Sequence, residues 1–406
     1  MYFKFAWRYF RAKKSANAIN IIAWVTTGVI AFATCCQVLV LSVFNGFEGL
    51  VKSLYSTFYS DVKIVPQKGK TFLLPANKIK AIKDLAFVYN FSLIAEDKAL
   101  LQNEEAKTPV IIKGVDSNYK KISGVPQKLS SGIFSIGTAD NPGLIVGYGV
   151  QNAANIVVDS VFAASTVTVI LPKKYIKGND PLASISEGNA KAKGVFAIQQ
   201  EFDNNYALTN IDFVKQQMNF KADEFSAIEI KLKTGTKENE AKEKLQNILG
   251  NSFLVQTRYE QNTGLYNRMK QKKWAIFAVL TLILVIAAFN MISAITMLVL
   301  EKKKDISILR SLGSTRAFIQ KIFLSEGILL GIIGAGIGIF LATVICLLQI
   351  KFHIIKLQGG SFLIDYFPVK LLAADFLLVA ATALFIALIA AWYPSVKASK
   401  QPIALK

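Results

Sequence analysis

Few residues in this chain of 406 have the chemistry that catalysis or metal binding usually requires. His353 is the only histidine, which leaves no basis for a histidine-ligated zinc centre or a Ser-His-Asp hydrolase. Neither HExxH nor the phosphate-binding motif GxxxxGK(S/T) occurs, so the chain cannot hydrolyse ATP through a P-loop. The three cysteines, Cys35, Cys36 and Cys346, all lie in apolar stretches. We expect no catalytic residue, no metal site and no cofactor-binding site.

The composition instead indicates a membrane protein. Hydrophobic residues make up 52% of the chain and charged residues 18%, and the mean hydropathy of +0.39 is higher than most soluble domains reach. Four apolar stretches are long enough to cross a hydrocarbon core, which takes about 20 helical residues. These stretches are Ile19–Val43, Trp274–Leu300, Gly327–Ile350 and Leu371–Tyr393.

The distribution of lysine and arginine predicts the orientation of the chain. Residues 1–18 contain basic but no acidic residues, and the 301–321 loop and the C-terminal tail are also rich in lysine and arginine. We therefore expect both termini in the cytoplasm and the large region between the first two spans on the opposite side. The lysines of that region are spread out among acidic residues, which favours a solvated surface over binding of nucleic acid.

These patterns predict four transmembrane helices and a large α+β exported domain between the first two of them. Residues 1–18 read as a cytoplasmic amphipathic helix, with an unstructured basic anchor as the alternative. The remaining segments are spans at 19–44, 273–300, 322–350 and 371–394, the exported domain at 45–272, a cytoplasmic loop at 301–321, an exported loop at 351–370 and a cytoplasmic tail at 395–406.

Short runs rich in Val and Ile, bounded by Gly, Pro or charged residues, predict the strands of the exported domain. The predicted strands are Val62–Val65, Pro109–Gly114, Gly143–Val146, Thr166–Leu171, Gly194–Gln199 and Ala227–Leu232. Helices are predicted at Lys78–Asp84, Ile211–Met218 and Lys237–Leu249. The segment Tyr175–Lys193 is dense in Gly, Asn, Pro and Ser, which predicts a long loop.

The cytoplasmic loop contains a short amphipathic helix. Ile306, Leu309 and Leu312 give it an apolar stripe, and Gly313 supplies the position that ends it. Ser314 or Thr315 then caps a second helix that enters the third span. Two interpretations remain open on physical grounds: the helix rests on lipid headgroups, or it is a docking element for a cytoplasmic protein.

Four strings resemble FtsX-like ABC permeases, and two of them resemble the lipoprotein-releasing branch of that family. The loop sequence from Leu300 to Gly313 is similar to the coupling-helix signature, and the C-terminal Tyr393–Leu405 is similar to the common ending. The string L-S-V-F-N-G-F-E at Leu41–Glu48 resembles the N-G-F-E motif of lipoprotein-releasing permeases. The string F-L-I-D-Y-F-P at Phe362–Pro368 resembles a segment before the last span of one of their two paralogues.

The resemblance implies a permease of the inner membrane with its large domain in the periplasm. Such a chain pairs with a second permease, a copy or a paralogue, and with a separate cytoplasmic ABC ATPase that holds the ATP and Mg²⁺. It lifts acylated lipoproteins out of the membrane lipid and passes them to a periplasmic carrier. The residues that would couple it to the ATPase are Lys304, Ile306, Ile308, Leu309, Leu312 and Gly313.

The resemblance also implies a lipoprotein-binding region at the outer-leaflet level, beside a helix break at Asn45-Gly46. Its expected residues are Val40, Val43, Phe44, Asn45, Phe47, Glu48, Phe362, Tyr366 and Phe367. The alternative is that the aromatic residues form an ordinary interfacial belt. The loop Pro172–Lys193 lies where one paralogue carries a carrier-recruiting hairpin.

Other functions fit parts of the pattern. An FtsX-like permease for efflux or for regulating cell-wall hydrolases is the alternative within the superfamily. A membrane-anchored sensor is the alternative outside it, although a sensor needs neither four spans nor a coupling helix. Within the spans, Glu326 and Asp375 are expected to snorkel or to pair near the membrane interfaces rather than to relay protons. Glycines spaced by four or three along the third span, Gly327 to Gly338, indicate close helix packing within the chain or between permeases.

Overall fold

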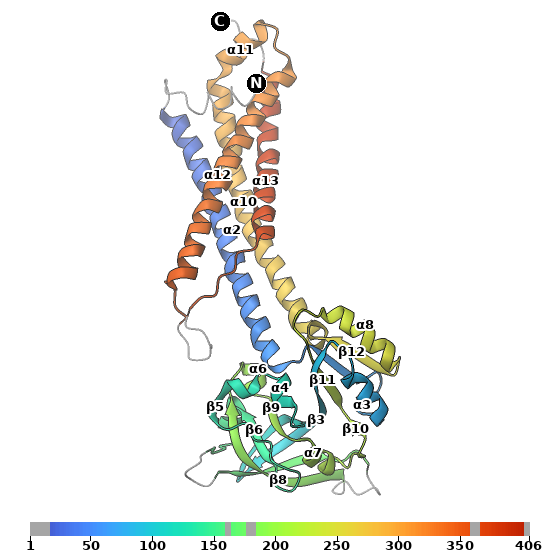
Figure 1. Cartoon of the computed structure of the whole chain (residues 1–406). Coiled ribbons are helices and arrows are strands. Elements are labelled where there is room, and N and C mark those ends of the chain that lie inside the picture. The colour runs from blue at the N-terminus through green and yellow to red at the C-terminus, as the bar shows by residue number, and fades with distance from the viewer. Residues whose placement is uncertain (1–16, 159–163, 176–183, 358–365, 402–406) are drawn as a thin grey trace. The chain divides into compact units, whose positions relative to one another are not determined.

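The computed structural model describes residues 17–158, 164–175, 184–357 and 366–401. These residues form two compact units (Figure 1). The helical unit contains residues 17–50, 267–357 and 366–401, and the sheet unit contains the described residues between 51 and 266. The predicted amphipathic helix at 1–18 lies almost entirely outside the described residues.

The helical unit contains four helices that are long and apolar enough to cross a membrane, as predicted. A short helix, α11, precedes the third of them within the 301–321 loop. The helices are α2 (Asn17–Phe58), α10 (Thr263–Glu301), α11 (Lys303–Ser311), α12 (Arg316–Phe352) and α13 (Ala373–Ser399).

The predicted helix break at Asn45-Gly46 is wrong. Helix α2 runs through both residues and continues to Phe58, well beyond the predicted end of the span at residue 44. The segment after Gly46 contains no proline, and one glycine costs a helix only about 1 kcal/mol, which packing readily offsets. Helix α10 likewise begins at Thr263, before the predicted start of its span at residue 273.

Four glycines of α12 pack within the chain, whereas Gly336 has nothing within 4 Å of an added Cβ. Gly327 and Gly331 face α13, whereas Gly334 and Gly338 face α2. A Cβ atom added to Gly338 would lie 2.4 Å from the carbonyl oxygen of Ala31, a distance that no side chain tolerates. The small residues therefore let the backbones of three helices approach closely, which assigns them to intrachain packing.

The sheet unit is an α+β domain, as predicted. Ten strands form one sheet in the order β12-β1-β11-β3-β4-β9-β6-β8-β5, and β7 pairs with β3 and β8. Most neighbours are antiparallel, but β4 pairs parallel to β9 and β6 parallel to β8. The strands are β1 (Val62–Pro66), β3 (Val88–Asn103), β4 (Ala106–Val115), β5 (Leu129–Gly132), β6 (Gly143–Gly147), β7 (Thr166–Pro172), β8 (Ile185–Phe196), β9 (Tyr206–Asn210), β11 (Ala227–Leu232) and β12 (Phe253–Thr257).

Short helices and a small second sheet complete the unit. Strands β2 (Phe72–Leu73) and β10 (Glu224–Phe225) pair with each other. The helices are α3 (Ala76–Lys83), α4 (Tyr119–Ile122), η1 (Val125–Lys128), α5 (Tyr148–Ala153), α6 (Gln200–Asp203), α7 (Ile211–Gln217), α8 (Glu238–Leu249) and α9 (Arg258–Gln261). A core of aliphatic side chains lies between the sheet and these helices, and Val62, Leu101 and Val146 are among its fully buried members.

The predicted elements of this domain are confirmed, with two corrections. Five of the six predicted strands and all three predicted helices are present, whereas the predicted strand Gly194–Gln199 overlaps only the end of β8, which stops at Phe196. The predicted loop Tyr175–Lys193 is partly wrong, because β8 begins at Ile185 and its residues 185–191 pair with β7. Alternation of small and polar residues in β8 concealed a strand whose outer side chains face solvent. Residues 176–183, the middle of the proposed carrier hairpin, lie outside the described residues.

Candidate functional site

Helix α11 ends where the sequence predicted. Leu312 is its C-cap, and Gly313 adopts a φ of 91°, a left-handed conformation that favours glycine. The amide of Gly313 donates a hydrogen bond to the carbonyl of Arg310 at 3.0 Å. Thr315 then caps α12, because its hydroxyl accepts a hydrogen bond from the amide of Phe318 at 3.2 Å.

One face of α11 is attached to the spans. Ile306 is only 2% exposed and packs in one apolar cluster with Ile319 and Phe323 of α12. The guanidinium of Arg310 donates a hydrogen bond of 2.5 Å to the backbone carbonyl of Gln401, just after α13. These contacts fix the helix to α12 and to the end of α13.

The opposite face of α11 is free of the rest of the described chain. Ile308 is 59% exposed and Leu312 is 78% exposed, and Lys304 is exposed beside them. Each residue of a helix is turned by about 100° from the one before it. Ile306 and Ile308 are two residues apart, so they point to opposite sides of α11. The predicted stripe is therefore divided: Ile306 faces inward, Leu309 is half-buried, and the surface open to a partner centres on Ile308 and Leu312.

The N-G-F string of α2 forms a second candidate site. Asn45 is buried, and its side-chain amide bridges two other helices. Its Nδ2 donates to Asp375 Oδ2 of α13 at 2.5 Å, and its Oδ1 accepts from Lys273 Nζ of α10 at 2.9 Å. Lys273 Nζ also lies 3.0 Å from Asp375 Oδ1, which makes an ion pair. Asp375 is therefore paired, as expected.

The residues next to Asn45 contact the segment before α13. The backbone of Gly46 lies so close to Pro368 that an added Cβ would be 2.1 Å from the Pro368 carbonyl oxygen. The rings of Phe47 and Phe367 meet edge to face, with centroids 5.8 Å apart. The two strings that resemble lipoprotein-releasing permeases therefore pack against each other. We call this contact between α2, residues 367–370, Lys273 and Asp375 the outer seam.

The outer seam also shows the surroundings of the predicted lipoprotein contacts. Asn45 is 3% exposed and is engaged at both ends of its amide, and its contact with a lipoprotein stays a prediction. Of the other predicted contacts, Val40 is 38% and Tyr366 36% exposed, and Phe362 lies outside the described residues. The half-buried ones are Val43, Phe44, Phe47, Glu48 and Phe367.

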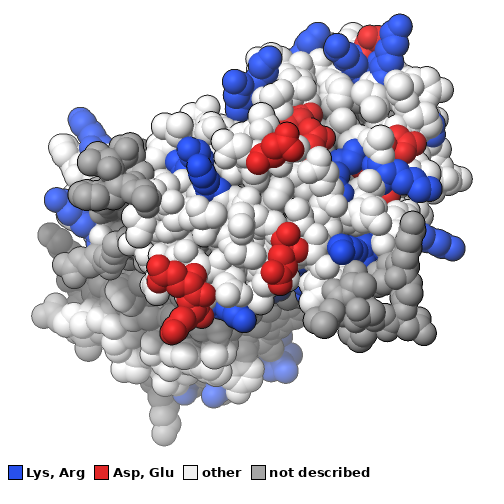
Figure 2. Space-filling model, turned by 90° about the horizontal axis from the view of Figure 1, so that it is seen from below, with Lys and Arg blue, Asp and Glu red and all other residues white. Residues whose placement is uncertain are grey.

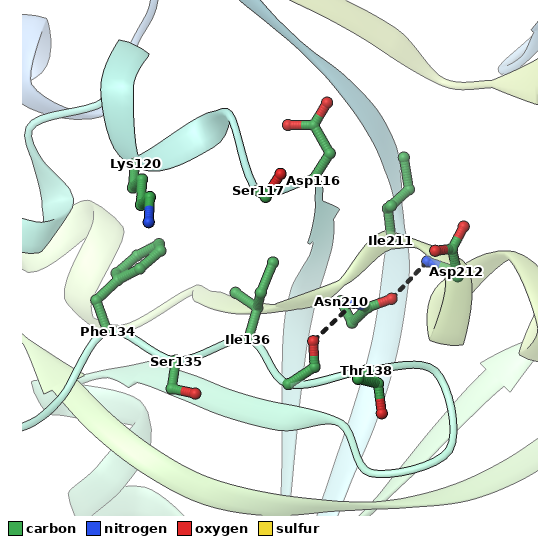
Figure 3. Close-up of a pocket in the computed structure, with 11 residues that line it drawn as sticks. Asp116, Ser117, Lys120, Phe134, Ser135, Ile136, Thr138, Asn210, Ile211 and Asp212 are labelled. Carbon is green, nitrogen blue, oxygen red and sulfur yellow. Dashed lines mark hydrogen bonds between the residues drawn. The ribbon is translucent and has the colours of Figure 1, made fainter.

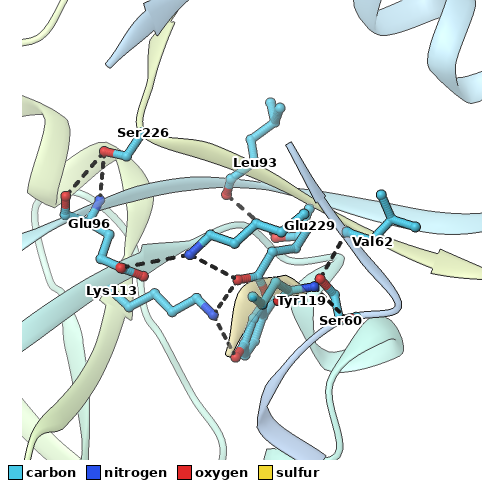
Figure 4. A network of polar contacts seen from close by, with 11 residues as sticks. Ser60, Val62, Leu93, Glu96, Lys113, Tyr119, Ser226 and Glu229 are labelled. Atoms are coloured by element: carbon cyan, nitrogen blue, oxygen red, sulfur yellow. Dashed lines mark hydrogen bonds and ion pairs between the residues drawn. The ribbon is translucent and has the colours of Figure 1, made fainter. Parts of the chain in front are cut away.

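The sheet unit contains a buried ion pair of its own (Figure 4). Lys113 of β4 and Glu229 of β11 are each 1% exposed, and their Nζ and Oε1 atoms lie 2.7 Å apart. Lys113 also donates to the hydroxyl of Tyr119 at 3.3 Å. Burial opposes the charge of Lys113, but the charges of Glu229, Tyr119 and Glu96 outweigh it and raise the pKa of the ammonium. Lys113 is therefore protonated at neutral pH.

The last turns of α2 pack on this ion pair through aromatic rings. Lys113 Nζ lies 4.9 Å from the ring centroid of Phe58, and Phe58 stacks on Phe202 at 4.4 Å. Tyr55 donates a hydrogen bond to the carboxylate of Glu201. Burial, together with the charge of Glu201, raises the pKa of the neighbouring Tyr59 to about 12. The end of α2 is thus held by both apolar and charged groups.

A cavity of about 600 Å³ lies between α4, the segment after β5 and the start of α7 (Figure 3). Asp116 lines it, but its carboxylate is already bound by the hydroxyl of Ser92 at 2.6 Å and by the amide of Asn118 at 3.0 Å. Asn210 is similarly engaged, because it caps α7 and donates to the carbonyl of Gly137 at 3.0 Å. These polar groups stabilise loops, so the cavity gives no indication of a ligand.

The face shown in Figure 2 carries charges of both signs. Among its described residues, lysines and arginines are interspersed with acidic residues. Among the described residues, no group of three or more His, Cys, Asp or Glu side chains could hold a metal ion.

The C-terminal part of the chain matches a known protein family. Residues 277–403, from within α10 to just after α13, match the family described as FtsX-like permease C-terminal. The chain carries an FtsX-like permease domain. This part includes α11 and its exposed face, where the sequence showed the coupling-helix signature.

The whole permease is similar to proteins of lipoprotein release. It is 24% identical to the lipoprotein-releasing system transmembrane protein LolE of Haemophilus influenzae, over 98% of this chain and 97% of that protein. It is 26% identical to LolC of Xylella fastidiosa, over 97% of this chain and 95% of that protein. The resemblance that the sequence strings suggested is confirmed. The periplasmic region of MacB from Actinobacillus actinomycetemcomitans covers 54% of this chain at 11% identity, with a TM-score of 0.37.

Proposed function

We propose that this permease is the transmembrane subunit of an ABC transporter that extracts acylated lipoproteins from the outer leaflet of the inner membrane. It releases them to a periplasmic carrier, and a separate cytoplasmic ATPase supplies the energy. The observation that carries the proposal is similarity over nearly the whole chain to two lipoprotein-releasing permeases. Efflux or regulation of cell-wall hydrolases has no comparable support.

The exposed face of α11 supports the part played by the ATPase. Its two apolar side chains, Ile308 and Leu312, are presented to the surroundings while Ile306 and Arg310 fix the helix to the spans. A displaced α11 would therefore move α12 and the end of α13 with it. ATP and Mg²⁺ belong to the ATPase in this arrangement, and both termini and α11 lie in the cytoplasm.

The free energy needed to extract acyl chains from the membrane supports an ATP-driven mechanism. Removing an acyl chain from lipid costs about 0.8 kcal/mol for each buried CH₂ group, so several chains need both an energy source and an apolar shelter. The half-exposed apolar residues Val40 and Tyr366 offer apolar surface for such a shelter beside the outer seam. The second permease chain, a copy or a paralogue, would complete it.

Depletion of the permease in its host tests the function. Acylated lipoproteins are expected to accumulate in the inner membrane, because the proposed transporter no longer lifts them from the outer leaflet. The measurement is fractionation of inner and outer membranes followed by detection of lipoproteins. Normal sorting after depletion would refute lipoprotein release while leaving the permease assignment intact.

A matched pair of variants tests the ATPase contact. Ile308→Asp places a charge on the exposed face of α11 and is expected to reduce co-purification of the ATPase at least tenfold. Ile354→Asp is the control, because Ile354 is 64% exposed but lies after α12, at the end remote from α11 in the chain. Equal ATPase recovery with both variants would contradict docking at Ile308.

A further inference from the structure

The outer seam joins three of the four candidate spans through contacts of different kinds. Asn45 of α2 connects Lys273 of α10 with Asp375 of α13. The backbone amide of Lys370 donates to the carbonyl of Ser42 at 3.0 Å, which adds a main-chain contact. Because these bonds have fixed geometry, α2 cannot slide along α13 without breaking several of them at once.

The seam has no space for a lipid chain. A single added Cβ on Gly46 would lie within 2.1 Å of the Pro368 oxygen, so not even a methyl group fits between α2 and this segment. Elsewhere the spans are open: Val279 and Phe289 of α10 are each 64% exposed. Cargo therefore has apolar helix faces available that do not require the seam to part.

We propose that Asn45 is a positioning residue that keeps the outer seam closed throughout the transport cycle, so that acyl chains move along other faces of the helices. The inference rests on the proposed function for the identity of the cargo. The closure of the seam is a property of the chain and can be measured separately.

Asn45 suits this role because its amide donates and accepts at the same time. Leucine is of similar size but provides neither bond, so Asn45→Leu would leave Lys273 and Asp375 without their bridge. If Asn45 acts only by holding α2 to α13, a covalent bond across the seam should restore lipoprotein release in Asn45→Leu. If Asn45 acts in any other way, such a bond should not restore release.

The experiment introduces Ser42→Cys and Lys370→Cys into a chain whose native cysteines, Cys35, Cys36 and Cys346, are replaced by alanine. The main chains at 42 and 370 are already hydrogen-bonded, so a disulfide has a short span to close. The complete transporter is assayed in membrane vesicles for ATP-dependent release of an acylated lipoprotein. Each variant is measured oxidised and reduced, with both single-cysteine chains as controls.

Three results are expected. The oxidised pair releases lipoprotein within about twofold of the reduced pair. Asn45→Leu without the cysteines loses release at least tenfold while its ATPase co-purification is unchanged. Asn45→Leu with the oxidised pair recovers to within threefold of its parent, and reduction cancels the recovery.

Two results would overturn the proposal. Loss of release in the oxidised pair, restored by reduction, would show that the seam must open. Failure of the disulfide to rescue Asn45→Leu would show that Asn45 does not act by closing the seam. If the parent chain itself releases no lipoprotein, the proposed function fails instead. In that case, the yield of the disulfide between positions 42 and 370, with and without ATP, still reports whether the seam is closed. A yield that falls when ATP is added would refute closure of the seam.

Discussion

Both units contain a lysine–carboxylate pair, but only the pair of the sheet unit is fully buried. In the sheet unit, Lys113 and Glu229 lie on strands either side of β3, under the ring of Phe58. In the helical unit, the side chain of Lys273 is 25% exposed and shares Asp375 with Asn45. The first pair has no route to water, whereas the second has a flexible lysine at its edge.

The difference indicates which pair tolerates the loss of one partner. Removing one partner of a fully buried pair leaves a charge that neither water nor another group solvates. A lysine that is partly exposed can turn its ammonium toward water or lipid headgroups, because its four-carbon stem is flexible. We therefore expect the sheet pair to set stability and the helical pair to set geometry.

The largest effect is expected from Glu229→Leu. This change leaves the Lys113 ammonium buried without its nearest carboxylate, which costs about 3–5 kcal/mol in comparable cases. The measurement is the urea dependence of protease resistance of the sheet unit in the full-length chain. A loss below about 1 kcal/mol would mean that Glu96 or water replaces Glu229.

A smaller effect is expected from Asp375→Leu. Lys273 loses its ion pair but keeps Asn45 as an acceptor, so the loss should be about 1–3 kcal/mol. Unfolding of the spans in mixed detergent and SDS micelles, followed by circular dichroism, measures it. A loss as large as that of Glu229→Leu would erase the distinction between the two pairs.

Replacing both members of the sheet pair should be nearly neutral. Lys113→Met with Glu229→Leu removes both charges and fills similar volumes, so stability should stay within about 1 kcal/mol of the parent. The same protease assay applies. If the double variant is as unstable as Glu229→Leu alone, then neighbouring polar groups such as Tyr119 require the ion pair as a hydrogen-bond partner.

The smallest effect concerns pH. The pKa of Tyr59 is raised to about 12 in the folded chain, so the folded state holds this proton more tightly than the unfolded state. Tyr59 therefore contributes stability that is fully present below about pH 10 and is lost as pH rises toward 12. Tyr59→Phe should lose less stability than the parent over this window in the protease assay. Identical pH profiles would refute the raised pKa.

Features that depend on neighbouring residues could be predicted from the sequence. The four spans follow from apolar length, five strands of the sheet from Val- and Ile-rich runs, and the end of α11 from Gly313. The division of the α11 stripe could not be predicted, because it depends on which residues of α12 Ile306 meets.

Features that depend on distant residues could not be predicted. Asn45 and Lys273 are 228 positions apart, Asn45 and Asp375 are 330 apart, and Lys113 and Glu229 are 116 apart. One signal was available: charges at the ends of apolar helices need partners, and Lys273 and Asp375 are such charges. That signal requires a pair but does not identify Asn45 as the bridge.

The strand order has a consequence for biosynthesis. Strand β1 is the first strand of the sheet unit to be made, yet it pairs only with β11 and β12, the last two strands of its sheet. The sheet therefore cannot close until translation passes Thr257, shortly before α10 emerges. Contacts so distant in sequence form slowly, and an incomplete sheet exposes strand edges. Export of this domain should thus depend on holding chaperones until α10 is synthesised.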